Sequence, residues 1–267
     1  MTPATLVKDA TYRQPFWTLP DRRITTLYAV ALGVVFIALL TAMLTPGERP
    51  ATLILDRTSP HFRYPFTIQN FEHIFFFLAL GELFVRWRVG AREIGFSKMG
   101  LLPEDQHTVL QAHDLSMLRH RVANQFDGEH GFLPSLIDTC ILQFMSGRSV
   151  DQTVAVMDSS LELIEHRVDM RYGLVRFIAW LVPTLGFIGT VIGLGSSLAA
   201  VPADSSKINM SQIAQTLAVG FDCTMVALVE SAVIVYLLQV VNEQEEKAVN
   251  LAGTYTLRNL INRLYAG

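Results

Sequence analysis

An apolar block from Ile24 to Leu44 sets the first limit on how this chain can fold, because it contains no charged residue. A helix that crosses a bilayer needs about 20 residues of this kind. The chain is 51% hydrophobic and 17% charged, whereas an average soluble domain carries about 25% charged residues. We therefore predict an all-α integral membrane protein whose first transmembrane helix is this block.

A second block, from about Asn70 to Val85, is strongly apolar but is interrupted by Glu72, His73 and Glu82. Ionisable side chains are costly in lipid, so this segment spans only if they face protein. A third block runs over residues 174–201. With the fourth block, at residues 213–241, the blocks predict four transmembrane helices.

Basic residues give the predicted orientation. Arg22 and Arg23 precede the first block, and Arg86, Trp87 and Arg88 follow the second. Basic residues mark the cytoplasmic side of a membrane. Both termini are therefore predicted to be cytoplasmic, and the first helix reads as a retained anchor rather than a cleaved signal.

Between the second and third blocks the sequence is polar with helical periodicity, which predicts amphipathic cytoplasmic helices. The apolar stripes are formed by Val109, Leu110, Leu115, Leu118 and Val122, by Leu133, Leu136, Ile137, Ile141 and Leu142, and by Val150, Val154, Leu161, Ile164 and Val168. No helix stop separates the third stripe from the third block, so one long helix is expected to rise from the cytosol into the bilayer.

These readings divide the chain into nine segments. They are a cytoplasmic N-terminal segment (1–23), the first span (24–45), an outer loop (46–69), the second span (70–88), a helical cytoplasmic domain (89–172), the third span (173–201), an outer turn (202–212), the fourth span (213–241) and a cytoplasmic amphipathic tail (242–267).

In the third span, Gly186, Gly189 and Gly193 recur at three- and four-residue spacing. This leaves one helix face without bulk, so another helix can approach closely. Packing within one subunit explains the glycines equally well. Thr190 adds a hydroxyl that can bond its own backbone or hold water in a lumen.

Polar residues interrupt the fourth span. At about 100° per residue, one face carries Thr216, Gly220, Cys223, Thr224, Ala227, Glu230 and Ser231. Such a stripe suits a water-filled pathway or a partner helix, although Glu230 could instead snorkel to the interface. Asp222 points roughly the opposite way and favours structural pairing over proton transfer.

Two motifs in order carry a family resemblance. The run from Leu181 to Leu194, which includes Pro183, is followed by the run from Gly220 to Leu228. Together they resemble the paired membrane motifs of the MotA/TolQ/ExbB proton channel family, over about Val168 to Glu243. Two helices before the cytoplasmic segment resemble the MotA arrangement more than the three-helix one of ExbB and TolQ.

The resemblance implies the channel subunit, or stator, of a molecular motor driven by the proton-motive force in the bacterial inner membrane. Five copies would surround the single membrane helix of a MotB-, ExbD- or TolR-like partner whose aspartate carries the proton. Pore-lining threonines of the family match Thr190 and Thr224. Proton flow would drive rotation and mechanical work at the cell envelope.

Other function classes are less well supported. The net charge of −3 gives no basic field for nucleic acid. The cytoplasmic histidines lack metal-ligand spacing, and no catalytic motif or cofactor site is recognisable, so we predict a non-enzyme. A structural or signalling scaffold without ion conduction remains the alternative, and a solute transporter using Asp222 and Glu230 ranks last. Replacing Thr190 with Val would separate channel from scaffold.

Overall fold

The computed structural model describes residues 19–57, 62–105, 108–125, 131–199, 201 and 210–265. Their regular structure is helical, apart from a single parallel bridge between Leu110 and Leu264. In chain order the helices are α1 (Arg22–Met43), α2 (Arg49–Leu55), α3 (Ile68–Phe96), α4 (Ala112–Gln125), α5 (Phe132–Gly147), α6 (Val150–Arg171), α7 (Gly173–Ala199), α8 (Met210–Asn259) and the short 3₁₀ helix η3 (Ile261–Arg263).

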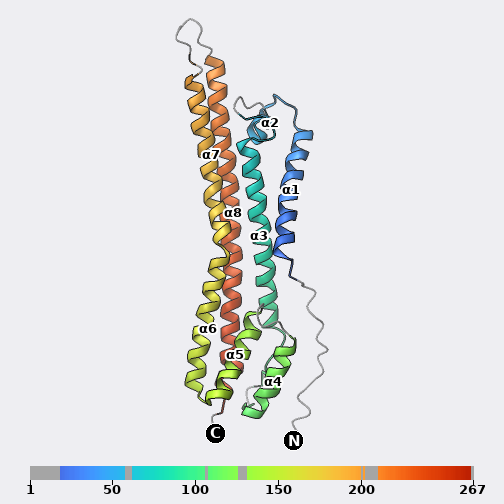
Figure 1. Cartoon of the computed structure of the whole chain (residues 1–267), viewed down its shortest axis with the longest axis vertical. Coiled ribbons are helices and arrows are strands. Elements are labelled where there is room, and N and C mark those ends of the chain that lie inside the picture. The colour runs from blue at the N-terminus through green and yellow to red at the C-terminus, as the bar shows by residue number, and fades with distance from the viewer. Residues whose placement is uncertain are drawn as a thin grey trace.

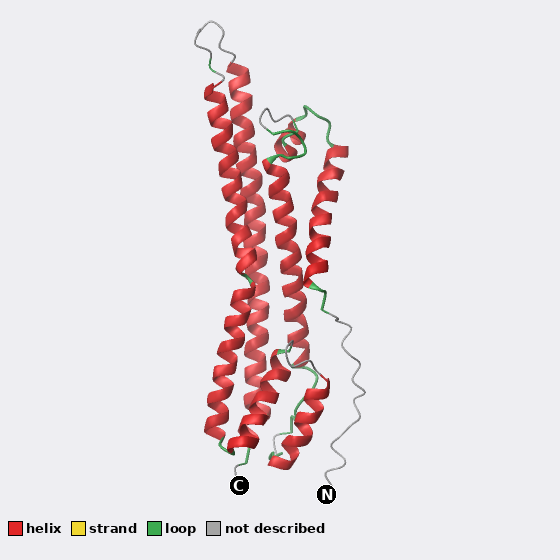
Figure 2. Cartoon of the chain, in the orientation of Figure 1, coloured by secondary structure: helices red, strands yellow, loops and turns green. Residues whose placement is uncertain are grey.

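The molecule is an elongated bundle (Figure 1). Helices α7 and α8 lie side by side along the length of α7, and α6 prolongs the line of α7 toward the end where α8 finishes. Helix α3 lies beside α8, and α1 packs against α3. Figure 2 shows α4 and α5 gathered at that same end, while the short α2 lies at the opposite end between α1 and α3.

Three helical stretches among the described residues are long and apolar enough to cross a membrane. They are Arg22–Met43, the α6–α7 stretch Val150–Ala199, and Ile213–Arg263. They cover most of the first and third predicted spans and all of the fourth. The second predicted span lies in α3, which is not one of the three.

The ionisable residues of α3 nevertheless face protein. Glu72 is fully buried, and His73 and Glu82 are each 3% exposed. Glu82 accepts hydrogen bonds from Arg22 and from the Thr26 hydroxyl at the start of α1. The condition that the sequence sets for this segment to span is therefore met.

The predicted continuous helix between cytosol and membrane is interrupted only at Tyr172. This residue caps α6 with helical torsion angles, φ −85° and ψ −3°, and α7 starts at the next residue. At the other side of the bundle, α8 runs for 50 residues without a break, through the expected membrane boundary at residue 241.

The predicted cytoplasmic stripes form much of the core. Leu133, Leu136, Ile137 and Ile141 are all at most 1% exposed. The prediction was wrong for Leu142, which is 42% exposed. It was also wrong for Val109, which is 59% exposed, because α4 begins only at Ala112. Just before α4, the backbone of Leu110 bonds to Arg263 and Tyr265 in the C-terminal segment, which replaces a helical turn.

The outer loop differs from the expected irregular segment because it contains α2. Pro50 lies in the first turn of this helix, where its missing N–H leaves no helical bond unmade. Asp56 ends it in the left-handed conformation, with φ 46°. Most of the predicted N-terminal segment and most of the loop between α7 and α8 lie outside the described residues. So do His107 and His130, two of the histidines in the segment predicted to be cytoplasmic.

Candidate functional site

The three glycines of the third span all lie where α7 crosses α8. A Cβ atom on Gly186 would lie 2.6 Å from the Ala227 Cβ, and one on Gly193 would lie 3.0 Å from the Gly220 Cα. Gly189 faces the Cys223 side chain in the same way. The small residues therefore bring the two backbones close enough for side chains on one helix to reach carbonyls on the other.

Hydroxyl groups on the two helices form hydrogen bonds across this close crossing. Thr190 on α7 donates to the Gly220 carbonyl on α8 at 2.9 Å, and Thr224 on α8 donates to the Gly186 carbonyl on α7 at 2.8 Å. Each threonine follows a glycine by four residues, so the arrangement is reciprocal. The Thr190 and Thr224 hydroxyls also contact each other directly.

Pro183 adds a further link. Proline has no N–H, so it leaves the carbonyl four residues earlier, that of Ala179, without its helical donor. The Ser231 hydroxyl on α8 donates to this carbonyl at 3.0 Å. Near the outer end, Ser197 makes a longer contact of 3.4 Å with the Ile213 carbonyl. We call these four side chains, Ser197, Thr190, Thr224 and Ser231, the hydroxyl ladder.

The threonine pair can change its bonding without changing its backbone. Each hydroxyl has one hydrogen to donate and two lone pairs to accept with. Two hydrogens therefore serve five contacts: each hydroxyl reaches both the Gly186 and the Gly220 carbonyl, and the two hydroxyls contact each other. A hydroxyl that turns away from its carbonyl can bond water or a carboxyl group, at the cost of one bond in the ladder.

Two predicted ion-pathway residues on α8 remain, Glu230 and Asp222. Glu230 faces α3 rather than α7. Its Oε1 lies 2.5 Å from Nδ1 of His73, and the residue is 9% exposed. The snorkelling alternative is therefore wrong, because the carboxyl group is held inside the bundle. The single predicted polar face of α8 divides into one side toward α7, with Thr224 and Ala227, and another toward α3.

Asp222 occupies a third side of α8. Its carboxylate lies 3.1 Å from the guanidinium of Arg49 at the start of α2. Asp222 is 5% exposed, whereas the Arg49 side chain is 65% exposed. This ion pair lies within the chain and anchors α2 to α8.

A second buried polar cluster lies at the junction of α6 and α7, beside α3 and α8. Glu245 on α8 is fully buried and accepts a 2.6 Å hydrogen bond from Tyr172. Arg86 and Arg171 each lie 3.9 Å from the same carboxylate. Burial raises the pKa of Glu245 above its ordinary value and raises that of Glu93 to about 6.

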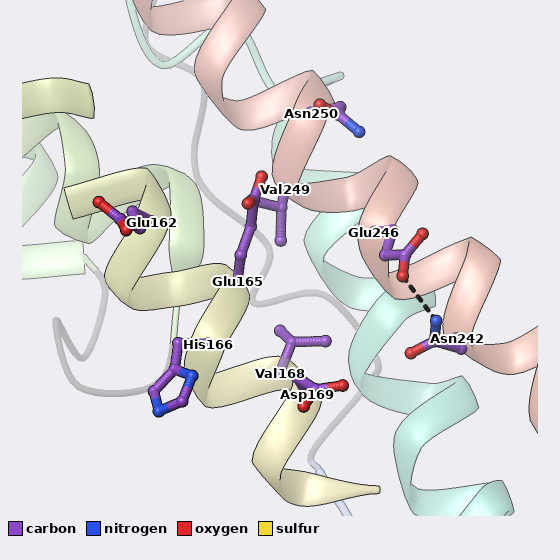
Figure 3. Close-up of a pocket in the computed structure, with 9 residues that line it drawn as sticks. All are labelled: Glu162, Glu165, His166, Val168, Asp169, Asn242, Glu246, Val249 and Asn250. Atoms are coloured by element: carbon purple, nitrogen blue, oxygen red, sulfur yellow. Dashed lines mark hydrogen bonds between the residues drawn. The ribbon is translucent and has the colours of Figure 1, made fainter. Parts of the chain in front are cut away.

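Below the hydroxyl ladder, α6 and α8 enclose an acidic groove of about 550 Å³ (Figure 3). Asn242 lies 18 residues after Thr224, five helical turns along the same side of α8. The groove is lined by Glu162, Glu165, His166, Val168, Asp169, Asn242, Glu246, Val249 and Asn250. The groove continues the ladder side of the bundle and gives its far end a negative potential, which attracts cations.

Sequence reasoning did not find the partners of the acids on α8. His73, Arg49 and Tyr172 are spread over α2, α3 and the α6–α7 junction. One available signal was the seven-residue repeat of Glu72, Ala79, Arg86 and Glu93, all of which are buried. Such spacing places residues on one helix face, so it predicts a polar seam along α3.

These features define a class: a helical membrane protein with a glycine-lined, hydroxyl-bearing crossing between two long spans. Residues 127–252 of the chain match the sequence model of the MotA/TolQ/ExbB proton channel family. The match confirms the predicted resemblance and extends it over α5 and α6. The family consists of channel proteins, not enzymes. No curated protein and no solved structure matches the chain.

Proposed function

We propose that this chain is the channel subunit of a membrane motor driven by the proton-motive force. The observation that carries the proposal is the reciprocal pair of Thr190 and Thr224 at the glycine-lined crossing. In this role their hydroxyls offer a polar site, inside the membrane, to the proton-carrying aspartate of a partner helix. Glu230 and Asp222 serve the pathway indirectly, because their carboxylates are held by His73 and Arg49.

The proposal includes α3 as a fourth span. Its 29 residues give a length of about 43 Å at 1.5 Å per residue, which exceeds the hydrocarbon thickness of about 30 Å. Phe71, Phe84 and Trp87 are each close to half exposed, and aromatic residues favour lipid interfaces. With α1, α7 and α8 this gives four spans and cytoplasmic termini in the inner membrane.

The exposed surfaces of the two long spans support an oligomer around a central partner. The outward faces of α7 and α8 carry large apolar side chains, including Phe187, Val191, Leu194, Phe221 and Met225. These faces suit lipid, neighbouring copies and a partner helix. We propose five copies around the membrane helix of a MotB-, ExbD- or TolR-like protein, as the family implies.

A scaffold without ion conduction is the competing function. The hydroxyl ladder supports it to the extent that interhelical hydrogen bonds hold membrane helices together, each worth about 0.6 kcal/mol. A scaffold would need the glycines but no free hydroxyl. The lone pairs of the threonine pair that accept no hydrogen bond within the chain favour the channel.

The first experiment is the mass of the complex purified from native membranes in a mild detergent or nanodiscs. The proposal predicts a ring of five copies that holds a small protein with one membrane helix and an aspartate within it. A monomer or dimer without such a partner would contradict the motor function and favour the scaffold.

A further inference from the structure

His73 has hydrogen-bonding partners on both ring nitrogens, and these partners restrict where its protons are. Nε2 lies 2.9 Å from the carbonyl oxygen of Ile54 on α2. A carbonyl only accepts, so Nε2 must carry a hydrogen. Nδ1 lies 2.5 Å from Oε1 of Glu230.

The short contact between Nδ1 and Oε1 then needs a proton of its own. A neutral imidazole protonated at Nε2 presents a lone pair at Nδ1, and an ionised carboxylate presents another. Two lone pairs repel at this distance. Either the imidazole is doubly protonated and the carboxyl ionised, or the imidazole is neutral and the carboxyl protonated. In both cases the pair has no net charge and holds one proton more than a neutral histidine beside a carboxylate.

The surroundings favour this neutral state. His73 is 3% exposed and Glu230 is 9% exposed, and Phe36 of α1 packs edge-on against the imidazole with ring centroids 5.6 Å apart. A net charge in such a place is strongly disfavoured. Losing the shared proton would leave the pair with a net negative charge.

Other ionisable groups surround the pair. Glu72 is fully buried beside His73, and its Oε1 accepts from the Cys223 thiol at 3.2 Å. Asp56, which ends α2, lines with Cys223 a cavity of about 30 Å³, room for about one water molecule. The groups that bear on the pair are Asp56 from α2, Glu72 from α3, Cys223 from α8, and the bonded Asp222–Arg49 pair between α8 and α2. The ionisable residue of α7, Arg176, is bonded to Asp169 at the cytoplasmic end.

We propose that His73 and Glu230 form a proton-binding site of the chain itself, in which one proton is shared between Nδ1 and Oε1. The site lies on the α3 side of α8 and is distinct from the hydroxyl ladder. The site binds a single proton. The cavity lined by Asp56 and Cys223 lies nearer the outer end of the bundle than the site does. The proposal requires neither a partner nor ion flow, so it stands or fails independently of the motor function.

The test uses the full chain in nanodiscs, labelled with ¹⁵N-histidine and studied by solid-state NMR. At about pH 8 an unfolded histidine and glutamate hold no proton between them. We expect a strongly downfield proton resonance that correlates with Nδ1 of His73 and is lost in both His73→Gln and Glu230→Gln. The matched control Glu82→Gln, which changes another buried acid of α3, should keep it. Absence of the resonance in the unaltered chain would overturn the proposal.

A second measurement covers the case in which one variant loses the resonance through misfolding. If the folded state holds one more proton than the unfolded state, raising the pH by one unit increases the unfolding equilibrium constant tenfold. Between about pH 7.5 and pH 8.5 we expect this tenfold dependence in the unaltered chain beyond that of Glu230→Gln, whose amide can donate to Nδ1 without a titrating proton. Identical pH dependence in the two proteins would contradict the shared proton.

Discussion

Tyr172 donates a 2.6 Å hydrogen bond from its hydroxyl to the carboxylate of Glu245 at the turn between α6 and α7. Both residues are fully buried. The bond links the only interruption in the α6–α7 line to the continuous helix α8. It therefore fixes how α6 is oriented relative to α8.

Replacing Tyr172 with Phe tests this link. The change leaves the packing in place but removes a donor from a buried carboxylate whose nearest cations lie 3.9 Å away. We expect the free energy of unfolding to fall by about 1–3 kcal/mol, measured by thermal or denaturant unfolding of the purified protein. Tyr236→Phe is the control, because Tyr236 is 68% exposed. If Tyr172→Phe costs as much in a Glu245→Gln background, the bond is not the cause.

The glycine-lined crossing predicts a sharp difference between two glycines of α7. A Cβ on Gly186 would lie 2.6 Å from the Ala227 Cβ, whereas one on Gly195 would meet nothing within 4 Å. Gly186→Ala should destabilise the protein by about 1–3 kcal/mol through overpacking, and Gly195→Ala should not. Thermal stability in detergent measures both. Ala227→Gly in the Gly186→Ala background should recover part of the loss, and equal behaviour of the two alanine variants would be inconsistent with the crossing.

The fourth span predicts on which side of the membrane two exposed positions lie. If α1 and α3 both cross, Thr45 lies outside and Ser146, on α5, lies in the cytoplasm; if α3 does not cross, both lie on the same side. An impermeant maleimide should label Thr45→Cys in intact cells, but Ser146→Cys only after permeabilisation. The native cysteines should stay silent because both are buried, and burial raises the pKa of the Cys140 thiol to about 12. Labelling of both variants in intact cells would show that α3 does not cross the membrane.

Much of the fold was predictable because lipid and helical periodicity leave strong signals. The charge-free block at Ile24–Leu44 and the stripe through Leu133, Ile137 and Ile141 each specify a helix and its buried face. The helix α2 was not predicted, because its seven residues are too few to show a period. The late start of α4 at Ala112 depends on pairing with a segment about 150 residues away, which no local pattern reveals.

The site was partly predictable for a related reason. The glycines were identified by their spacing, and Thr190 and Thr224 by their match to the family's pore-lining threonines. The structure brings them together at one crossing. A single-helix projection could not assign Glu230 to a neighbour, because α8 packs against α2, α3 and α7 on different sides. Which side faces which helix is a tertiary fact, so His73 and Arg49 emerged only from the fold.

The central claim is tested most directly by proton flux through the complex, purified with its partner and reconstituted in liposomes, with Thr190→Val compared with Thr184→Val. Thr184 lies on the same helix, and its hydroxyl bonds the Trp180 carbonyl of its own turn. Under the proposed function, Thr190→Val removes a hydrogen bond to the charged aspartate of the partner helix. Such a bond is worth about 1.5–3 kcal/mol, which corresponds to a flux about tenfold to hundredfold slower. We predict that loss for Thr190→Val with assembly intact, and near-normal flux for Thr184→Val. Unchanged flux in an intact Thr190→Val complex would contradict the channel role of the threonine pair.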